Sequence, residues 1–301
     1  MGVQETAGRR TIGFVNPKSG PNGSGISQGE LAGLFREAGL DADIVPITGG
    51  NAITAERIGR GADLVIAAGG DGTVSSIAAA VAGTGATLGI VPAGTLNHFA
   101  RDLGIPLDIR SACRVIAAGK TIAVDAAEVN GRIFVNNSSI GLYPAFAADR
   151  ERWMKRGVPK RIAMIPAAVR ALARFPNLGV RVDRDEDVDL SIRTPLLFIG
   201  NNEYQFSGWK AGTRSGLREG VLQIATVDNP SRWSLAALAM RAALGTQLHA
   251  PELHVSMAKK VRVRTFRKHV KVALDGEVVR MRSPLIYSIR PGALKVIVPH
   301  A

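Results

Sequence analysis

The sequence has little cysteine and few aromatic residues. Its 301 residues include one cysteine, Cys113, so an intrachain disulfide framework is excluded and a reducing compartment is favoured. Phe, Trp and Tyr together make up 5% of the residues, and no aromatic RNA-binding motif is present, so nucleic acid is not an expected partner. The first ten residues lack the apolar segment of a secretory signal. We therefore expect a cytoplasmic protein.

Uninterrupted apolar runs of membrane-spanning length are absent as well. One stretch without charge, from Thr73 to Asn97, contains several glycines and Pro92. A transmembrane helix needs about 20 consecutive, predominantly apolar residues. The interruptions instead predict a helix, a turn, a strand and a loop.

Acidic residues are scarce relative to basic ones. The chain has 38 Lys and Arg against 25 Asp and Glu, a formal net charge of +13, and a sequence pI near 10.5. The resulting positive field attracts an anionic partner, such as nucleic acid, nucleotide phosphates or an acidic membrane face. Charge alone does not choose among these partners.

Two clusters of basic residues fit an anionic membrane surface. One runs through strand-like sequence and comprises Lys259, Lys260, Arg262, Arg264, Arg267, Lys268 and Lys271. The other accompanies a helical pattern and comprises Lys160, Arg161, Arg170 and Arg174 beside Ile162, Met164, Ile165, Leu172 and Phe175. Basic residues beside apolar ones are typical of peripheral membrane binding. The alternative is a solvated strand face and an ordinary helix whose apolar side faces the core.

The first 125 residues alternate between strand and helix patterns. Apolar runs that end in turn residues predict strands, and helical spacing of apolar residues predicts helices. The expected strands are 11–15, 43–47, 64–68, 87–91 and 121–127, and the expected helices are 27–38, 55–61, 74–82, 96–103 and 110–118. This alternation predicts an α/β domain with an open, mostly parallel sheet.

After residue 125 strand patterns predominate. They occur at 132–136, 180–182, 188–192, 196–199, 221–227, 261–263 and 270–274, with two helices expected at 163–175 and 231–247. Many strands separated by turn residues predict a β-sandwich-like second domain. The last apolar run, 294–298, is expected to return to the first domain. We therefore expect one domain of residues 1–125 with 289–301, and a second of residues 126–288.

Three glycines surround one carboxylate in Gly69-Gly70-Asp71-Gly72-Thr73, where a strand pattern ends and a helix pattern begins. At such a junction the free N–H groups and the dipole of the helix favour an anion, and glycine lets the backbone approach a phosphate closely. The segment is neither G-x-G-x-x-G nor the Walker-A pattern. A tight strand–helix turn without a ligand is the alternative.

Two similar loops, Asn16-Pro17-Lys18-Ser19-Gly20 and Pro92-Ala93-Gly94-Thr95-Leu96-Asn97, follow other expected strands. Loops after the strands of a parallel sheet meet at its carboxyl edge, where α/β ligands bind. Three such loops with one carboxylate suit a nucleoside triphosphate with Mg²⁺. Asp71 would hold the metal or orient a hydroxyl, and Lys18 would add a phosphate contact.

The N-P-x-S-G, G-G-D-G-T and P-x-G-T-x-N series, in this order and spacing, resembles the diacylglycerol kinase catalytic-domain family. This family groups bacterial lipid kinases with sphingosine kinases, and NAD kinases are more distant relatives. The second half adds Val135–Gly141, similar to the family's N-x-x-S-x-G stretch, and also Ile199–Asn202 and Leu274–Glu277. The resemblance covers nearly the whole chain.

The resemblance implies ATP contacts in the three loops and at one further threonine. These residues are Asn16, Pro17, Lys18, Ser19, Gly20, Thr48, Gly69, Gly70, Asp71, Gly72, Thr73, Val74, Ser75 and Thr95. It also implies that Glu277 is the proton acceptor, because a carboxylate can take the proton of a lipid hydroxyl as that oxygen bonds to phosphorus. Without the resemblance, Asp275-Gly276 predicts a hairpin turn. Both interpretations hold if the turn presents Glu277.

Two departures from the family pattern limit what is carried over. Asn97-His98 stands where the family often has Asn-Asp, so no metal or catalytic role is assigned to His98. The family's D-D-G magnesium loop corresponds to Arg218-Glu219-Gly220, which implies metal ligands at Gly216, Glu219 and Val221. One acid beside Arg218 is a poor magnesium site on charge grounds.

We therefore expect an ATP- and Mg²⁺-dependent lipid kinase that associates peripherally with a membrane. Its acceptor would be diacylglycerol by default, while phosphatidylglycerol or a sphingoid base would use the same chemistry. Two alternatives stay open: an NAD-kinase-type enzyme with a soluble substrate, and a nucleotide-responsive membrane-binding protein without catalysis. No motif in the sequence encodes the acyl chain, the headgroup or the oligomeric state.

Overall fold

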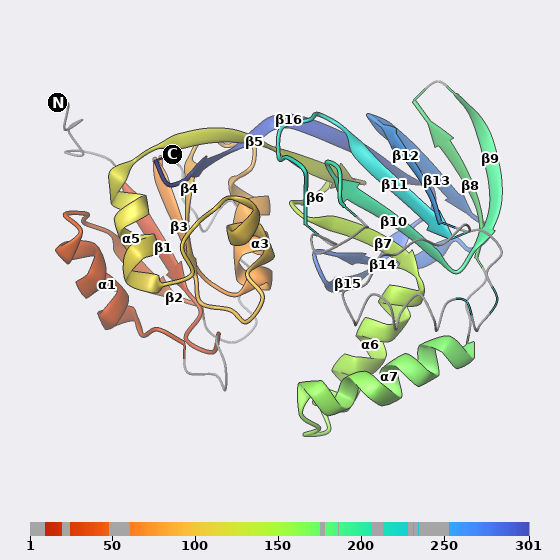
Figure 1. Cartoon of the computed structure of the whole chain (residues 1–301), viewed down its shortest axis with the longest axis horizontal. Coiled ribbons are helices and arrows are strands. Elements are labelled where there is room, and N and C mark those ends of the chain that lie inside the picture. The colour runs from red at the N-terminus through yellow and green to blue at the C-terminus, as the bar shows by residue number, and fades with distance from the viewer. Residues whose placement is uncertain are drawn as a thin grey trace. The chain divides into compact units, whose positions relative to one another are not determined.

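The structure is a computed structural model of the 301-residue chain (Figure 1). It describes residues 10–19, 25–47, 61–174, 178–185, 187–205, 213–227, 231, 234 and 253–300. Contacts divide the chain into two compact units. Unit 1 comprises Met1–Ala126 and Pro291–Ala301, and unit 2 comprises Ala127–Arg290.

Unit 1 is built on a parallel sheet with the strand order β2-β1-β3-β4-β16. Its strands are β1 (Thr11–Val15), β2 (Asp43–Pro46), β3 (Leu64–Gly69), β4 (Thr87–Pro92) and the last part of β16 (Leu285–Ile297). Its helices are α1 (Gln28–Glu37), α3 (Asp71–Val81), α4 (His98–Asp102) and α5 (Ile109–Ala118), after which β5 (Thr121–Val129) begins. All residues of β1 and β3 are buried, as expected for strands covered on both faces.

The direction of the chain explains why helices cover both faces of this sheet. The step from β1 to β2 and the step from β3 to β4 run toward opposite edges, and right-handed crossovers then place α1 and α3 on opposite faces (Figure 1). On one face, Leu31 and Phe35 of α1 join Cys113 and Ile116 of α5 in a buried cluster. Ser27 begins α1 with a reciprocal capping box.

Unit 2 is a β-sandwich with a helical hairpin. Its six-stranded antiparallel sheet has the order β12-β11-β10-β7-β14-β15, and its second layer contains β13, β8, β9, the first part of β16 and the β5–β6 pair. The elements are β6 (Arg132–Phe134), β7 (Asn137–Gly141), α6 (Leu142–Met154), α7 (Lys160–Arg174), β8 (Leu178–Arg184), β9 (Asp187–Thr194), β10 (Leu196–Asn201), β11 (Leu222–Val227), β12 (Leu253–Ala258), β13 (Lys260–Thr265), β14 (His269–Leu274) and β15 (Glu277–Arg282). Apolar side chains from both layers form one buried cluster, in which Phe134 and Tyr287 meet edge to face.

The expected fold class, a mostly parallel α/β domain joined to a β-sandwich domain, is confirmed. The final strand also behaves as expected, because Lys295 of β16 pairs with Thr87 of β4. Helix α4 is shorter than the predicted 96–103, since Asn97 adopts the left-handed conformation with φ 53°. The helix predicted over 55–61 lies outside the described residues apart from Gly61, and so does most of the one predicted over 231–247.

One prediction about unit 2 was wrong. We expected only two helices after residue 125, whereas the structure has α6 immediately after β7. Its buried residues include Pro144, Ala147 and Asp149, so α6 lacks the stripe of large apolar residues by which a helix is recognised in sequence. Within the described part of the chain, no helix is long and apolar enough to cross a bilayer.

Candidate active site

The three glycine-containing loops of unit 1 lie at one edge of the sheet. They follow β1, β3 and β4, which are adjacent parallel strands, so the carboxyl ends of these strands meet there. Two backbone hydrogen bonds join the loops directly. The amide of Asn16 donates to the carbonyl of Ala68 at 2.9 Å, and that of Ala93 donates to the carbonyl of Gly69 at 2.9 Å.

Asn16 organises the first loop and links it to the second. Its side-chain oxygen accepts the amide of Lys18 at 3.1 Å, and its side-chain nitrogen donates to Oγ1 of Thr73 at 3.2 Å. Its carbonyl accepts both the amide and the hydroxyl of Ser19, at 3.1 and 2.6 Å. These bonds leave the Lys18 side chain exposed at the loop edge.

The second loop ends in a helix N-terminus that no side chain caps. Helix α3 begins at Asp71, and its N-cap is Gly70, which has no side-chain oxygen to accept the first amides. Such amides, together with the helix dipole, attract an anion. Val74 and Ser75 are buried in this helix, and the amide of Val74 already donates to the carbonyl of Gly70 at 3.0 Å, so their predicted contacts with ATP stay a prediction.

The glycines of these loops are required for two different reasons. A Cβ on Gly69 would lie 2.6 Å from Cβ of Thr73, and a Cβ on Gly94 would lie 2.5 Å from Cα of Gly70. Close packing within the second loop therefore explains Gly69, and close packing between the second and third loops explains Gly94. A Cβ on Gly72 would meet no described atom within 4 Å. Packing does not explain that glycine, whereas the close approach of a phosphate would.

Asp71 fastens the second loop to the third. Its carboxylate accepts the amides of Asn97 and His98, at 2.9 and 2.6 Å, and thus satisfies the N-terminus of α4. The Asn97 side chain in turn bonds both the amide and the carbonyl of Gly94, each at 2.9 Å. A carboxylate has further lone pairs, so the predicted role of Asp71 in holding metal or a hydroxyl stays a prediction. His98 itself is exposed.

The D-G-E segment in unit 2 forms the two-residue hairpin turn between β14 and β15. Asp275 and Gly276 both have positive φ, 48° and 91°, and Leu274 pairs with Glu277, as in a type I′ turn. The carboxylate of Asp275 accepts the amides of residues 135, 136 and 137 at 2.9, 2.8 and 3.0 Å. Glu277 is the first residue of β15, and its side chain is exposed.

Sequence reasoning missed several residues that shape these segments. Arg214 is buried and donates to the carbonyl of Val135 at 2.6 Å and to Oδ1 of Asn136 at 3.1 Å, while its guanidinium lies over the Tyr204 ring. Arg214 and Asp275 thus hold the same segment. Asn97 had a usable signal, because asparagine tolerates the left-handed conformation. A single arginine in a polar loop gives no such signal.

The residues proposed for a metal lie together, but they do not form an obvious magnesium site. One carboxylate oxygen of Glu219 accepts the amide of Glu203 at 3.0 Å, and the other lies beside Gly216. The carbonyl of Val221 accepts the amide of Asn202 at 3.0 Å. Among the described residues, no group of three or more His, Cys, Asp or Glu could hold a metal ion. Gly20 and Thr48, predicted to contact ATP, lie outside the described residues.

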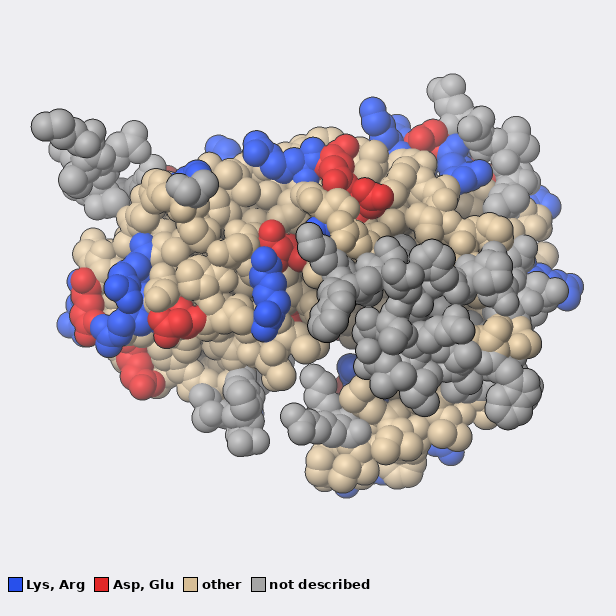
Figure 2. Space-filling view, in the orientation of Figure 1, with Lys and Arg blue, Asp and Glu red and all other residues tan. Residues whose placement is uncertain are grey.

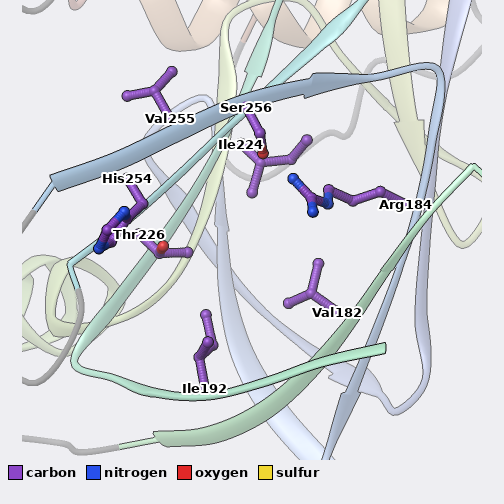
Figure 3. A pocket seen from close by; sticks show the side chains of 8 residues that line it. All are labelled: Val182, Arg184, Ile192, Ile224, Thr226, His254, Val255 and Ser256. Carbon is purple, nitrogen blue, oxygen red and sulfur yellow. The ribbon is translucent and has the colours of Figure 1, made fainter. Parts of the chain in front are cut away.

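A cavity in unit 2 lies apart from the D-G-E hairpin. Its volume is about 240 Å³, and its lining residues come from β8, β9, β11 and β12 (Figure 3). They are Val182, Arg184, Ile192, Ile224, Thr226, His254, Val255 and Ser256. In the six-stranded sheet, β10 and β7 lie between β11 and β14, which separates the two places by roughly 14 Å. The cavity is therefore not a continuation of the hairpin that carries Glu277.

The chain thus combines an α/β unit, with three interlinked loops at one sheet edge, and a β-sandwich unit, and comparison with known proteins identifies the family. Residues 10–129 match the diacylglycerol kinase catalytic domain, and residues 144–298 match the YegS C-terminal NAD kinase β-sandwich-like domain. The chain belongs to the diacylglycerol kinase family of lipid kinases. The resemblance inferred from the motifs is thereby confirmed.

Relatives align with most of the chain. A protein of Mycobacterium tuberculosis named diacylglycerol kinase is 28% identical over 309 aligned residues, covering 96% of this chain and 95% of that protein. A probable lipid kinase, YegS-like, of Pseudomonas aeruginosa is 30% identical over 275 residues, covering 88% and 87%. A diacylglycerol kinase of Bacillus subtilis is 27% identical over 272 residues, covering 88% of each chain.

Solved structures support the fold. A putative diacylglycerol kinase from Bacillus anthracis superposes with a TM-score of 0.72 at 23% identity, covering 98% of this chain and 99% of that chain. An NAD kinase from Archaeoglobus fulgidus in complex with ATP has a TM-score of 0.51 at 10% identity, covering 95% and 93%. At these identities the likeness shows the fold alone.

Proposed function

We propose that this protein is an ATP-dependent lipid kinase that transfers the terminal phosphoryl group of ATP to a hydroxyl of diacylglycerol or a related membrane lipid. The observation that carries the proposal is the sheet edge of unit 1, where three interlinked loops surround the uncapped N-terminus of α3. The relatives named diacylglycerol kinase support the lipid acceptor. Gly72 supports the phosphate position, because no packing contact requires it.

In the proposed reaction, the lipid hydroxyl attacks the terminal phosphorus of ATP and ADP leaves. Glu277 takes the hydroxyl proton as the new oxygen–phosphorus bond forms. Its exposed carboxylate stands beside a turn that Asp275 holds in place through three amides, so the base would be well positioned. Mg²⁺ bound with ATP would neutralise charge on the phosphates. The loops of unit 1 would supply orientation and backbone N–H groups.

The decisive experiment is a kinase assay on extracted membrane lipids with labelled ATP, followed by mass spectrometry of the product. Glu277→Gln should lower kcat by about a hundredfold or more while ATP affinity is retained, as expected when a general base is removed. Glu203→Gln removes another exposed carboxylate of unit 2 and should stay close to wild type. A normal rate in Glu277→Gln would show that the assigned base is wrong.

The same assay separates the alternatives. Phosphate transfer to NAD without any lipid product would favour a soluble-substrate kinase of the NAD-kinase type. Nucleotide and membrane binding without transfer to any lipid in the extract would favour a non-catalytic, nucleotide-responsive membrane protein. A phosphorylated lipid identified by mass would name the acceptor.

A further inference from the structure

The two faces of α7 are inverted relative to those of an ordinary surface helix. Helix α7 packs against α6, and its buried residues are alanines four positions apart, Ala163, Ala167 and Ala171. Large aliphatic side chains lie on the opposite side: Ile162 is 58% exposed, Ile165 is 68% exposed and Val169 is 64% exposed. A helix of a soluble domain normally buries its large apolar residues and exposes polar ones. Helix α7 therefore has an apolar core side made of alanines, and it also carries large apolar residues on its exposed side.

The spacing of the exposed residues makes them one surface. Ile162, Ile165 and Val169 are three and four residues apart, so their side chains stand in a row along one side of the helix. Single exposed apolar residues are normal on proteins, whereas a contiguous row beside polar residues marks a place of contact. We call this row the outer face of α7.

The charge around the outer face is positive. Residues 142–174 contain eight Lys and Arg against two acids. Both acids already face a base: Asp149 pairs with Arg152 at 2.7 Å, and Glu151 pairs with Lys155 at 2.8 Å. The two acids thus offset only part of the positive charge that these residues carry. Figure 2 shows largely uncharged surface over α7, with Lys and Arg at its border.

A second exposed apolar side chain belongs to the same unit. Phe266, in the turn between β13 and β14, is 94% exposed and is followed by Arg267 and Lys268. Its ring lies over the backbone of Gly179, where an added Cβ would approach it to 2.5 Å. Gly179 is five residues beyond Arg174, the last residue of α7, so the chain limits their separation to roughly 18 Å. An exposed aromatic side chain followed by two cations is therefore a second apolar feature of unit 2, beside the strand that follows α7 in the chain.

We propose that the outer face of α7 docks on an anionic lipid bilayer, with Ile162, Ile165 and Val169 entering the boundary between headgroups and acyl chains. A protein partner would also cover apolar residues, but the excess of cations favours a surface of dense negative charge. An amphipathic helix with basic residues beside its apolar face binds in this interfacial position. The inference deepens the proposed function, because it states how the kinase would reach an acceptor that resides in the membrane.

The test is the binding of the full-length protein to vesicles of phosphatidylcholine with or without phosphatidylglycerol, measured by co-sedimentation. The double variant Ile165→Ser/Val169→Ser should bind anionic vesicles at least about tenfold more weakly, a loss that persists at high salt because it is apolar. Arg156→Gln/Arg170→Gln should reduce binding mainly at low salt. Leu107→Ser is the control, since Leu107 is 39% exposed in unit 1, outside both basic clusters, and should not affect binding.

Several outcomes would overturn the proposal. It is wrong if Ile165→Ser/Val169→Ser binds vesicles like the wild type, or if Leu107→Ser loses as much binding as that double variant. A second contrary result would come from light scattering. If the wild type is a dimer, the double variant is a monomer and neither protein binds vesicles, the outer face joins two copies of the chain and the proposal is wrong. An assay with a short-chain, monomeric diacylglycerol separates membrane docking from the proposed kinase activity. The double variant should still phosphorylate this soluble substrate. If the wild type does not phosphorylate it, the proposed kinase activity is refuted and the docking proposal is not.

Discussion

Gly72 offers the sharpest test of the phosphate-binding site, because replacing it should separate nucleotide binding from folding. An added Cβ at this position meets no described atom within 4 Å, and the residue lies in the first turn of α3. Alanine is a better helix former than glycine by up to about 1 kcal/mol. Gly72→Ala should therefore leave Tm unchanged or raise it by roughly 2–4 °C.

Nucleotide binding should respond in the opposite direction. If a phosphate rests against the Gly72 backbone, a methyl group there crowds it, and overpacking typically costs about 1–3 kcal/mol. This range corresponds to a rise in the Kd for ATP of roughly 5- to 150-fold. Isothermal titration calorimetry with ATP and Mg²⁺ measures the affinity, and differential scanning calorimetry without nucleotide measures Tm.

Gly94→Ala is the matched comparison, because here the protein itself occupies the space. The new Cβ would lie 2.5 Å from Cα of Gly70 and 2.7 Å from Oδ1 of Asn97, so the second and third loops must move apart. This variant should lose about 1–3 kcal/mol of stability and also bind ATP poorly. Gly72→Ala with unchanged ATP affinity would refute the phosphate assignment, and a lowered Tm in that variant would show that the fold requires the glycine.

Two further predictions concern stability. Asp275→Asn replaces one acceptor oxygen with an N–H donor that faces a backbone amide. It should lower the free energy of unfolding by about 1–3 kcal/mol and lower Tm in calorimetry. Glu277 is exposed, so Glu277→Gln should leave Tm unchanged. Burial raises the pKa of the Cys113 thiol from 9.0 to about 11, and burial likewise raises the pKa of Tyr287, so the folded state holds these protons longer than the unfolded state. The contribution of Cys113 to stability is complete below pH 9 and is lost as pH rises toward 11, and the contribution of Tyr287 begins to fall only above pH 10. The denaturant midpoint should therefore fall between pH 9 and 11, and a midpoint constant from pH 8 to 11 would contradict the burial argument.

Local patterns predicted much of unit 1. Helix α1 was predictable because the helical spacing of its apolar residues is a local signal, and the structure adds a capping box between Ser27 and Glu30. The strand at 64–68 was predictable because a run of apolar residues between turn signals is typical of a strand buried on both faces. Helix α6 was not, because it buries small and polar residues such as Ala147 and Asp149 instead of a large apolar stripe.

The inverted helix α7 shows a different limit. Its helical spacing was visible in the sequence, but the sequence pattern alone did not reveal which side faces the protein. Large aliphatic residues usually mark the core side, whereas here alanines allow α7 to pack against α6 and the isoleucines face outward. Deciding between the two sides required the position of α6, a helix that the sequence pattern had not predicted.

The acids of the family motifs divide into two kinds, and this division explains why the candidate site was only partly predictable. Asp71 and Asp275 bond backbone amides of segments 26–27 and 138–140 residues away, so their partners depend on the folded topology and cannot be read from neighbouring residues. Each thereby fixes a loop or turn that carries other site residues. Glu277 instead projects an exposed carboxylate from a turn that Asp275 has fixed. A group that must take a proton from a substrate has to meet that substrate. Of these three acids, Glu277 is therefore the one that suits the proposed role of base, while the amide bonds of Asp71 and Asp275 suit a positioning role.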